Sequence, residues 1–252
     1  PAPLTVTAND QSKVYGNVFT FTGAEFAASG LQNGETVGSV ALASAGAAAT
    51  ATVVAGPYPI TAANATGGSF DPANYVIAYV PGTMTVTPRP IAVTADNQTK
   101  VYGAADPALT FNASGLVNGD TLSGALARAP GESVPGSPYA ITQGTVTDAT
   151  NPNYAIAFTP GALAITPAPL TIAANDASRL YGDPNPAFGA TFVGLVNADT
   201  PAAIAALSID TAATAASNAG AYAIVPSGGV NPNYAISYVD GTLTIVPAPL
   251  AV

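Results

Sequence analysis

Hydrophobic side chains alternate with small ones in short runs along the chain. In the run 154–158, which reads Tyr-Ala-Ile-Ala-Phe, every second side chain is large, and this is the period of a half-buried β-strand. The alternation resumes over 163–165 after the pair Pro160-Gly161, and a Pro-Gly turn between two such runs is typical of a hairpin. We therefore predict a β-hairpin here, with counterparts over residues 75–86 and 234–245.

Further short elements are predicted from the same kind of pattern. An opening strand places Leu4 and Val6 on one face, and another strand covers residues 108–111. A Tyr-x-Ile pattern predicts one more strand in each of the segments 58–60, 139–141 and 222–224. After the sequence Asn-Gly-Asp-Thr, we expect a short helix over 122–127, because Asp120 or Thr121 can accept hydrogen bonds from the free N–H groups of a first helical turn.

Four sequence marks recur in the same order, so internal repetition is the dominant signal in the chain. The first mark is an apolar strand start at Pro3, Pro90 and Pro169, which returns at Pro249. The second is a basic residue that is separated by one residue from a Tyr-Gly pair, and its members are the structural marks of the repeat: Lys13, Tyr15, Gly16, Lys100, Tyr102, Gly103, Arg179, Tyr181 and Gly182. The other two marks are the Gly-Leu-x-Asn segments at 30–36, 115–121 and 194–200, and the Asn-Tyr runs that open the predicted hairpins.

These repeats predict three domains, with residues 1–88, 89–167 and 168–247. Residues 248–252 are either the start of a fourth repeat or a truncated linker. A module of about 80 residues is long enough to have its own core. The boundaries fall at Pro-x-Pro segments, and proline fixes its own φ and pushes the preceding residue to extended geometry. We therefore expect short, stiff joints and an elongated rod of modules.

Composition supports a β-rich chain and excludes two classes of partner. The 252 residues include 25 glycines and 23 prolines, both of which are unfavourable inside helices. The formal charge of −9 gives no attraction to nucleic acid or to anionic lipid. The segment 36–70 carries no charge but is interrupted by glycine and proline, so we expect no membrane insertion. Without cysteine, each module must be held together by its core.

At the marks quoted above, the chain resembles the bacterial MBG domain of the Tyr-Gly-x type, which is named for a mucin-binding β-grasp architecture. The resemblance covers all three repeats. It implies a mostly β (α+β) fold of tandem β-grasp-like modules, each a small mixed sheet with one short helix. It also implies long, adhesin-like bacterial proteins that are secreted or attached to the cell surface, and it suggests contact with glycans or mucin. The resemblance supplies no binding residues to carry over.

The residues available for chemistry are few. The chain has no histidine or cysteine, so the common general base, thiol nucleophile and soft metal ligand are missing, and we predict no catalytic site and no enzyme. The acids Glu35, Asp120 and Asp199 occupy one repeated position, where capping of a helix accounts for them better than catalysis does. We expect the repeated cation of the Tyr-Gly mark to pair with these acids.

Two binding interpretations remain open. Tyr75, Tyr154 and Tyr234 could stack on sugar rings, although their constant place in the repeat favours a role in the core. The Asp- and Asn-containing turn 183–186 could hold Ca²⁺, but no calcium-binding motif accompanies it, and we expect no cofactor.

Three functions fit this sequence, and the first is favoured. The modules act as a structural stalk or spacer in a large extracellular or surface-attached protein. Alternatively, they bind carbohydrate or mucin weakly and gain avidity from repetition. In the third possibility, copies of the chain assemble into an extracellular fibre or matrix. The expected partners are neighbouring repeats of the same chain, other copies of it in a fibre, and glycans.

Overall fold

The computed structural model describes residues 1–249 and consists mostly of β-strands. The predicted start of a fourth repeat at 248–252 therefore lies largely outside the described residues. The strands of the first repeat are β1 (Ala2–Ala8), β2 (Gln11–Val14), β3 (Phe26–Ser29), β4 (Val37–Ala43), β5 (Tyr58–Gly68), β6 (Tyr75–Val80) and β7 (Gly82–Thr87). Those of the second are β8 (Arg89–Ala95), β9 (Gln98–Val101), β10 (Phe111–Ser114), β11 (Ala127–Arg128), β12 (Tyr139–Thr142), β13 (Tyr154–Thr159) and β14 (Gly161–Thr166). Those of the third are β15 (Ala168–Ala174), β16 (Ala177–Leu180), β17 (Ala190–Val193), β18 (Ser208–Thr211), β19 (Gly220–Ser227), β20 (Tyr234–Val239) and β21 (Gly241–Val246).

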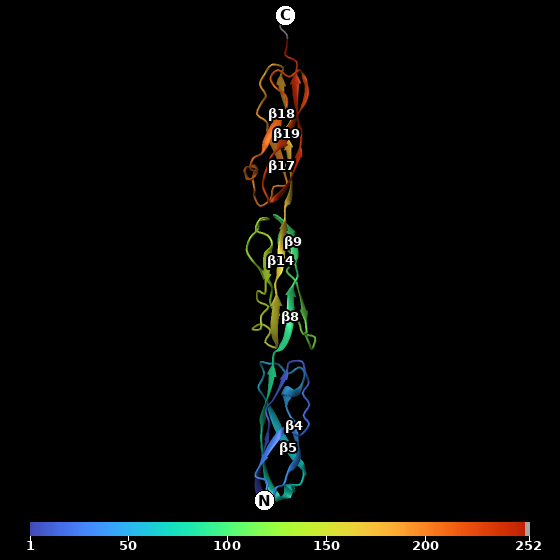
Figure 1. Cartoon of the computed structure of the whole chain (residues 1–252), viewed down its shortest axis with the longest axis vertical. Helices are drawn as coiled ribbons and strands as arrows, with labels where there is room; N and C mark the ends of the chain where they lie inside the picture. Colours follow the sequence, from blue (N-terminus) through green and yellow to red (C-terminus); the bar gives the residue numbers. More distant parts are fainter. Residues whose placement is uncertain (250–252) are drawn as a thin grey trace. The chain divides into compact units, whose positions relative to one another are not determined.

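Every repeat builds two small mixed sheets from these strands. In the first repeat their strand orders are β3-β1-β6 and β2-β7-β5-β4. The pairs β1–β6 and β2–β7 are parallel, whereas the other pairs are antiparallel. Figure 1 shows the long antiparallel pair of β4 and β5. Leu4, Val6 and Ala8 lie buried on one face of β1, as the period of two predicts.

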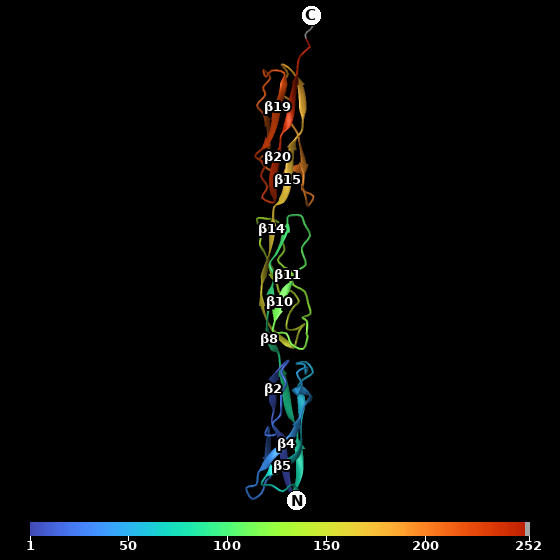
Figure 2. The same ribbon diagram turned by 90° about the vertical axis from the view of Figure 1, so that its right-hand side faces the viewer.

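The same topology recurs in the other two repeats. The second has sheets β10-β8-β13 and β11-β12-β14-β9, and the third has β17-β15-β20 and β16-β21-β19-β18. The parallel pair of β15 and β20 is seen in Figure 2. The prediction of a mostly β chain of repeated small mixed sheets is therefore confirmed, although each repeat has two sheets rather than one.

The predicted hairpins are wrong, although their strands are present. β6 pairs with β1, whereas β7 pairs with β2 and β5, so the two strands belong to different sheets. β20 and β21 likewise belong to different sheets, since β20 pairs with β15 and β21 pairs with β19. The chain does not reverse between β6 and β7. Gly82 instead lies against the end of β1, where an added side chain would be 2.4 Å from the Ala8 carbonyl oxygen. The glycine thus lets the chain pass close to β1 as it moves to the second sheet.

The predicted helix is also absent. The helices in residues 1–249 are single 3-10 turns: η1 (Ala45–Ala47), η2 (Pro72–Asn74) and η3 (Pro201–Ala203). Only η3 directly follows a Gly-Leu-x-Asn mark. The segment 122–127 is instead irregular, with a bend at Gly124, and leads into β11. Asn118 and Gly119 have φ of 57° and 78°, so this element is a tight turn, and the acid beside it does not cap a helix. The strand predicted at 108–111 begins only at Phe111.

By their contacts, the residues group into two compact units. Unit 1 has residues 1–96, 109–127 and 142–160, and unit 2 has residues 97–108, 128–141 and 161–249 of the described chain. The division passes through the second repeat, so unit 1 holds its sheet around β8 and unit 2 holds its sheet around β14. The three-domain division of the sequence stays a prediction.

Each unit contains one proline joint, and the strands on its two sides are separated by a single residue. Pro88 lies between β7 and β8 in unit 1, and Pro167 lies between β14 and β15 in unit 2. The first residue of each following strand donates its N–H to an asparagine carbonyl at 2.9 Å, from Arg89 to Asn153 and from Ala168 to Asn233. Proline's fixed φ and these bonds restrict both joints.

Candidate functional site

The most elaborate polar cluster in unit 1 is the contact between the first Tyr-Gly mark and the next repeat. The hydroxyl of Tyr15 donates to the Asp120 carboxylate at 2.8 Å, and the hydroxyl of Tyr154 donates to the same oxygen at 2.7 Å. The two rings meet edge to face, with centroids 5.5 Å apart. Both rings are buried, with exposed fractions of 4%. One carboxylate therefore joins tyrosines from two repeats.

Unit 2 contains the same arrangement one repeat further along. Tyr102 and Tyr234 donate to one oxygen of Asp199, at 3.1 and 2.7 Å, and their rings are also edge to face, at 5.4 Å. The repetition of both hydrogen bonds and of the ring geometry indicates a built junction rather than a chance contact.

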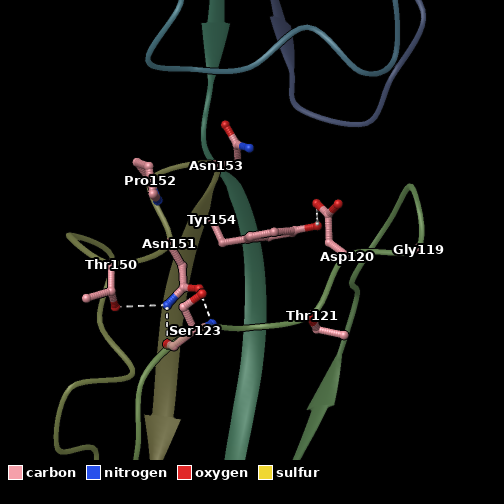
Figure 3. A pocket seen from close by; sticks show the side chains of 9 residues that line it. All are labelled: Gly119, Asp120, Thr121, Ser123, Thr150, Asn151, Pro152, Asn153 and Tyr154. Atoms are coloured by element: carbon pink, nitrogen blue, oxygen red, sulfur yellow. Dashed lines mark hydrogen bonds between the residues drawn. The ribbon is translucent and has the colours of Figure 1, made fainter.

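An asparagine side chain adds a second bond across each junction. The side-chain oxygen of Asn153 accepts the Val53 N–H at 2.9 Å, and that of Asn233 accepts the Val134 N–H at 2.9 Å. Figure 3 shows Asn153 pointing toward the loops of the first repeat, while Tyr154 reaches Asp120. Each of these two asparagines directly precedes a junction tyrosine.

The glycine of the Tyr-Gly mark is required where the repeats touch. Gly16 and Gly103 have φ of +85° and +80°, and a side chain on either would come within 2.4 Å of the γ-carbon of Val117 or Val196. Positive φ and close approach both select glycine. The Asn-Gly or Asn-Ala turn that carries the junction acid therefore packs directly on the tyrosine-glycine backbone.

The repeated cations do not pair with these acids, contrary to expectation. The Lys13 ammonium donates to the backbone carbonyls of Asn17 (2.8 Å) and Ala48. Lys100 binds Asp106 at 2.7 Å and also Glu132, and Arg128 bridges the same two carboxylates. The acids bind tyrosines, whereas the cations bind groups of their own repeat.

The third cation, Arg179, follows the pattern of Lys13. It donates to the Asn185 side chain at 2.8 Å, to the Leu180 carbonyl at 3.0 Å and to the Thr214 carbonyl at 2.5 Å. Lys13, Lys100 and Arg179 are all buried. Each of these cations ties its Tyr-Gly strand to a loop about 35 residues later in the same repeat. In the first repeat this loop also contacts the second repeat, because the Ala49 carbonyl accepts a hydrogen bond from the Asn118 side-chain amide at 3.2 Å. Asn185 of the candidate Ca²⁺ turn is thus used to hold Arg179.

Burial and the neighbouring carboxylate change the acidity of the junction tyrosines. Burial, followed by the hydrogen bond to Asp120, raises the pKa of Tyr154 to about 12. Burial likewise raises the pKa of Tyr15 and of Tyr234. In the first repeat the hydrogen bond to Glu35 is the largest cause of a raised pKa of Tyr75. These phenols therefore stay protonated donors at neutral pH.

The burial of the three candidate stacking tyrosines favours a role in the core. Tyr75, Tyr154 and Tyr234 have exposed fractions of 8%, 4% and 5%, so little of any ring is available to a sugar. Tyr181 differs from the other tyrosines of its mark because 47% of it is exposed. Glycan stacking at the three buried positions, and the roles of the repeat marks, remain predictions.

An open polar pocket of about 420 Å³ lies beside Asp120 and Tyr154 in unit 1. Its far wall is the segment 150–153 (Figure 3). Asn151 in this wall is buried and is held by the Ser123 N–H at 2.7 Å and the Ser123 carbonyl at 3.0 Å. Hydroxyl, amide and carboxylate groups of this kind can bind a polar ligand by hydrogen bonds.

Several junction residues escaped the sequence interpretation. Asn153 and Asn233 were noted only as part of a mark, and Val117 and Val196 were not singled out. Arg89, the middle residue of the first Pro-x-Pro segment, donates to the carbonyls of Gly115 (3.0 Å) and Tyr15 (3.3 Å). The signal for the asparagines was available, since Asn precedes Tyr in every repeat.

The fold and the junctions define a chain of tandem mixed-β repeats with a tyrosine-carboxylate contact between neighbours. The family model for the MBG domain (YGX type) matches residues 4–85, 91–164 and 170–244. The chain therefore belongs to this family, in three tandem copies. None of the curated proteins matches the chain. Among solved structures, the chain is similar to the I9–I11 tandem from titin, with 12% identity, a TM-score of 0.25, and coverage of 97% of this chain and 100% of that one.

In the described residues, the search for membrane-spanning helices found none of sufficient length and apolarity.

Proposed function

We propose that the three repeats are structural spacer modules of an adhesin-like bacterial protein that is secreted or held at the cell surface. The single observation that carries the proposal is the repeated junction, in which one carboxylate binds tyrosines from two successive repeats. A contact built twice with the same geometry suits a chain that must hold its repeats in a fixed relation. Family membership supports the adhesin-like and surface-associated setting.

Several independent restraints act at each junction. Proline limits rotation at the joint, the asparagine amide fixes the approach of the loops, and the buried tyrosine pair resists bending because separating it would expose apolar rings. The spacer function follows from restricted joints, since freely jointed modules would not keep a defined reach.

Small-angle scattering of the natural chain tests this function. Three modules in series, about 90 to 120 Å long, would give a radius of gyration of about 26 to 35 Å, whereas a compact globule of this length has about 18 Å. We expect a radius of gyration between about 26 and 35 Å. A value near that of the globule would contradict the spacer function. A radius of gyration that lies below this range and increases toward it when Tyr15 and Tyr102 are both replaced by alanine would contradict it too.

A second candidate function, glycan binding, is favoured by the polar pocket beside Asp120. Its walls offer the hydroxyl and amide groups that recognise sugars, and repetition would add avidity to weak single sites. Binding of the natural chain to a glycan array, with loss of signal in Thr121→Ala, would support it. A blank array would remove this candidate.

A further inference from the structure

The first and last segments of the first repeat lie side by side as one parallel pair. Six residue pairs join β1 to β6, beginning with Ala2 and Tyr75, and four join β2 to β7, beginning with Gln11 and Met84. Partners are 73 positions apart in both ladders. The register therefore does not slip where the two segments pass together from one sheet to the other.

A side chain fills the gap between these two ladders. Asp10 lies between β1 and β2, and its carboxylate accepts the Thr83 N–H at 2.7 Å. Thr83 is also 73 positions from Asp10, so the side chain binds the residue that the register places opposite it. The contacts between the two segments thus continue through the change of sheet.

The same bond occurs twice in unit 2. The Asp176 carboxylate accepts the Thr242 N–H at 2.7 Å, between the parallel pairs β15–β20 and β16–β21, and all these partners are 66 positions apart. The side-chain oxygen of Asn97 accepts the Ala162 N–H at 2.9 Å. A side-chain acceptor therefore joins the two ladders in every repeat of the described chain.

Apolar side chains cover one face of the parallel pair. Leu4 and Val6 on β1 have exposed fractions of 1% and 0%, and Met84 and Val86 on β7 have 0% and 4%. The corresponding positions of β15 and β21 are buried too. Water competes for hydrogen bonds wherever it reaches them, so this cover protects the ladder from one side.

The order of the strands decides how tension acts on this pair. The chain enters a repeat at the start of its first strand and leaves at the end of its last, and the segments that hold these two points run in the same direction. A pull along the chain therefore slides the segments past each other along their length. The evenly spaced bonds of a parallel ladder then carry the load together, whereas a pull across the strands breaks them one after another.

We propose that each repeat bears tension along the chain, and that the parallel pair of its first and last segments is the clamp that resists it. In the first repeat the clamp is residues 2–14 with 75–87, and Asp10, Asn97 and Asp176 join the two ladders of the three clamps. This function goes beyond that of a spacer, which has to keep a distance but need not carry a load. It rests on the proposed function only for the source of the pull.

The direction of loading tests the clamp, with magnetic tweezers that hold the chain at constant load. The chain has no cysteine, so introduced cysteines decide where the load is applied. Handles at the two ends of the chain load every clamp lengthwise. In the variant Pro1→Cys with Asn74→Cys, which changes two exposed residues, the load instead separates the neighbouring starts of β1 and β6.

End-to-end loading should give three unfolding steps, each releasing about 80 residues and up to about 250 Å of chain. At the same load we expect each step to be at least about tenfold slower than the single step of the cross-loaded variant. The reason is that several bonds must break together, and one bond alone changes an unfolding rate by about tenfold. Equal rates in the two directions would overturn the proposal.

Asp10 provides the second test under end-to-end load. In Asp10→Ala, one of the three steps should become about tenfold faster while the other two keep the natural rate. Asp10→Asn should restore that step, because Asn97 makes the same bond in the second repeat. Asp71→Ala is the matched control: it also removes a carboxylate that accepts a backbone N–H, that of Ala73 at 3.0 Å, but outside the clamp.

Asp71→Ala should leave all three steps unchanged. Natural rates in every step of Asp10→Ala would overturn the proposal, and so would an acceleration in Asp71→Ala as large as that in Asp10→Ala. Scattering measures the chain without load, so the spacer function and the clamp can fail separately. A chain with the expected radius of gyration but equal unfolding rates in both directions would keep the first and lose the second.

Discussion

The hydroxyl of Tyr15 donates to the carboxylate of Asp120 at 2.8 Å, although the two residues are 105 positions apart in the chain. The bond joins the first repeat to the second. Tyr154, which belongs to the same repeat as Asp120, donates to the same carboxylate oxygen. Because hydrogen bonds to charged groups are stronger than neutral ones, this pair is the natural place to weaken a junction with the least change.

Removal of the Tyr15 hydroxyl should destabilise the chain without disturbing its packing. Tyr15→Phe keeps the edge-to-face ring contact but leaves Asp120 with one donor fewer in a partly buried site, so we expect a loss of about 1.5–3 kcal/mol. Denaturant unfolding followed by circular dichroism measures it. Tyr181→Phe is the matched control and should change the free energy of unfolding by less than about 0.5 kcal/mol, as exposed substitutions do. Equal effects of the two substitutions would contradict the assigned bond.

The repeated glycines offer a second matched comparison. Alanine at Gly16 or Gly182 meets a similar positive φ, but only at Gly16 does it also meet Val117. Gly182→Ala should therefore cost about 1 kcal/mol from backbone strain alone. Gly16→Ala should cost about 1–3 kcal/mol more, which is the range for overpacking. Thermal unfolding of both variants checks this order, and a larger loss in Gly182→Ala would show that contact with valine is not what selects the glycine.

The strands could be predicted from the sequence because their signal is local. Alternation of large and small side chains is set by the pleat, so β1, β6 and β13 were placed to within about two residues. Their partners could not be read in this way. The segments that flank Pro81-Gly82 look like a hairpin, and only the strand pairing in the folded chain shows that they go to different sheets.

The site was predictable in its members but not in its contacts. Tyr15, Asp120 and Tyr154 were each found through repetition, yet the acid was interpreted as a helix cap and the cation as its partner. Pairing across a junction depends on how one repeat meets the next, and no pattern within a single repeat contains that information. The buried Lys13 illustrates the same limit, since backbone carbonyls bind it and these leave no trace in the sequence.

The role of Lys13 can be tested by exchange with the residue found in the third repeat. Lys13→Met leaves the carbonyls of Asn17 and Ala48 without their donor, and we expect a loss of about 1–3 kcal/mol. Lys13→Arg should recover most of it, because Arg179 binds the carbonyl of the corresponding loop at the equivalent position. The free energy of unfolding of the natural chain, Lys13→Met and Lys13→Arg measures both effects. A methionine variant as stable as the natural chain would mean that burial of the alkyl chain, rather than its ammonium group, holds the loop.

Ionisation of the junction tyrosines should destabilise the chain at high pH. Burial raises the pKa of Tyr154 to about 12, whereas an unfolded tyrosine has a pKa of about 10. A raised folded pKa of an acid gives stability that is complete below the unfolded pKa and is lost as the pH rises through the folded pKa. The contribution of Tyr154 should thus disappear between pH of about 10 and 12.

Two measurements check this pH dependence. Ultraviolet difference absorbance should reveal a class of tyrosines that ionises above the rest, and Tyr154→Phe should remove its highest member. The difference in unfolding free energy between the natural chain and Tyr154→Phe should also shrink over the same interval. Asp120→Asn removes the negative charge that opposes ionisation and should move this titration to lower pH. Titration of all tyrosines as one group near the unfolded value would contradict the buried, carboxylate-bound phenol on which both junctions depend.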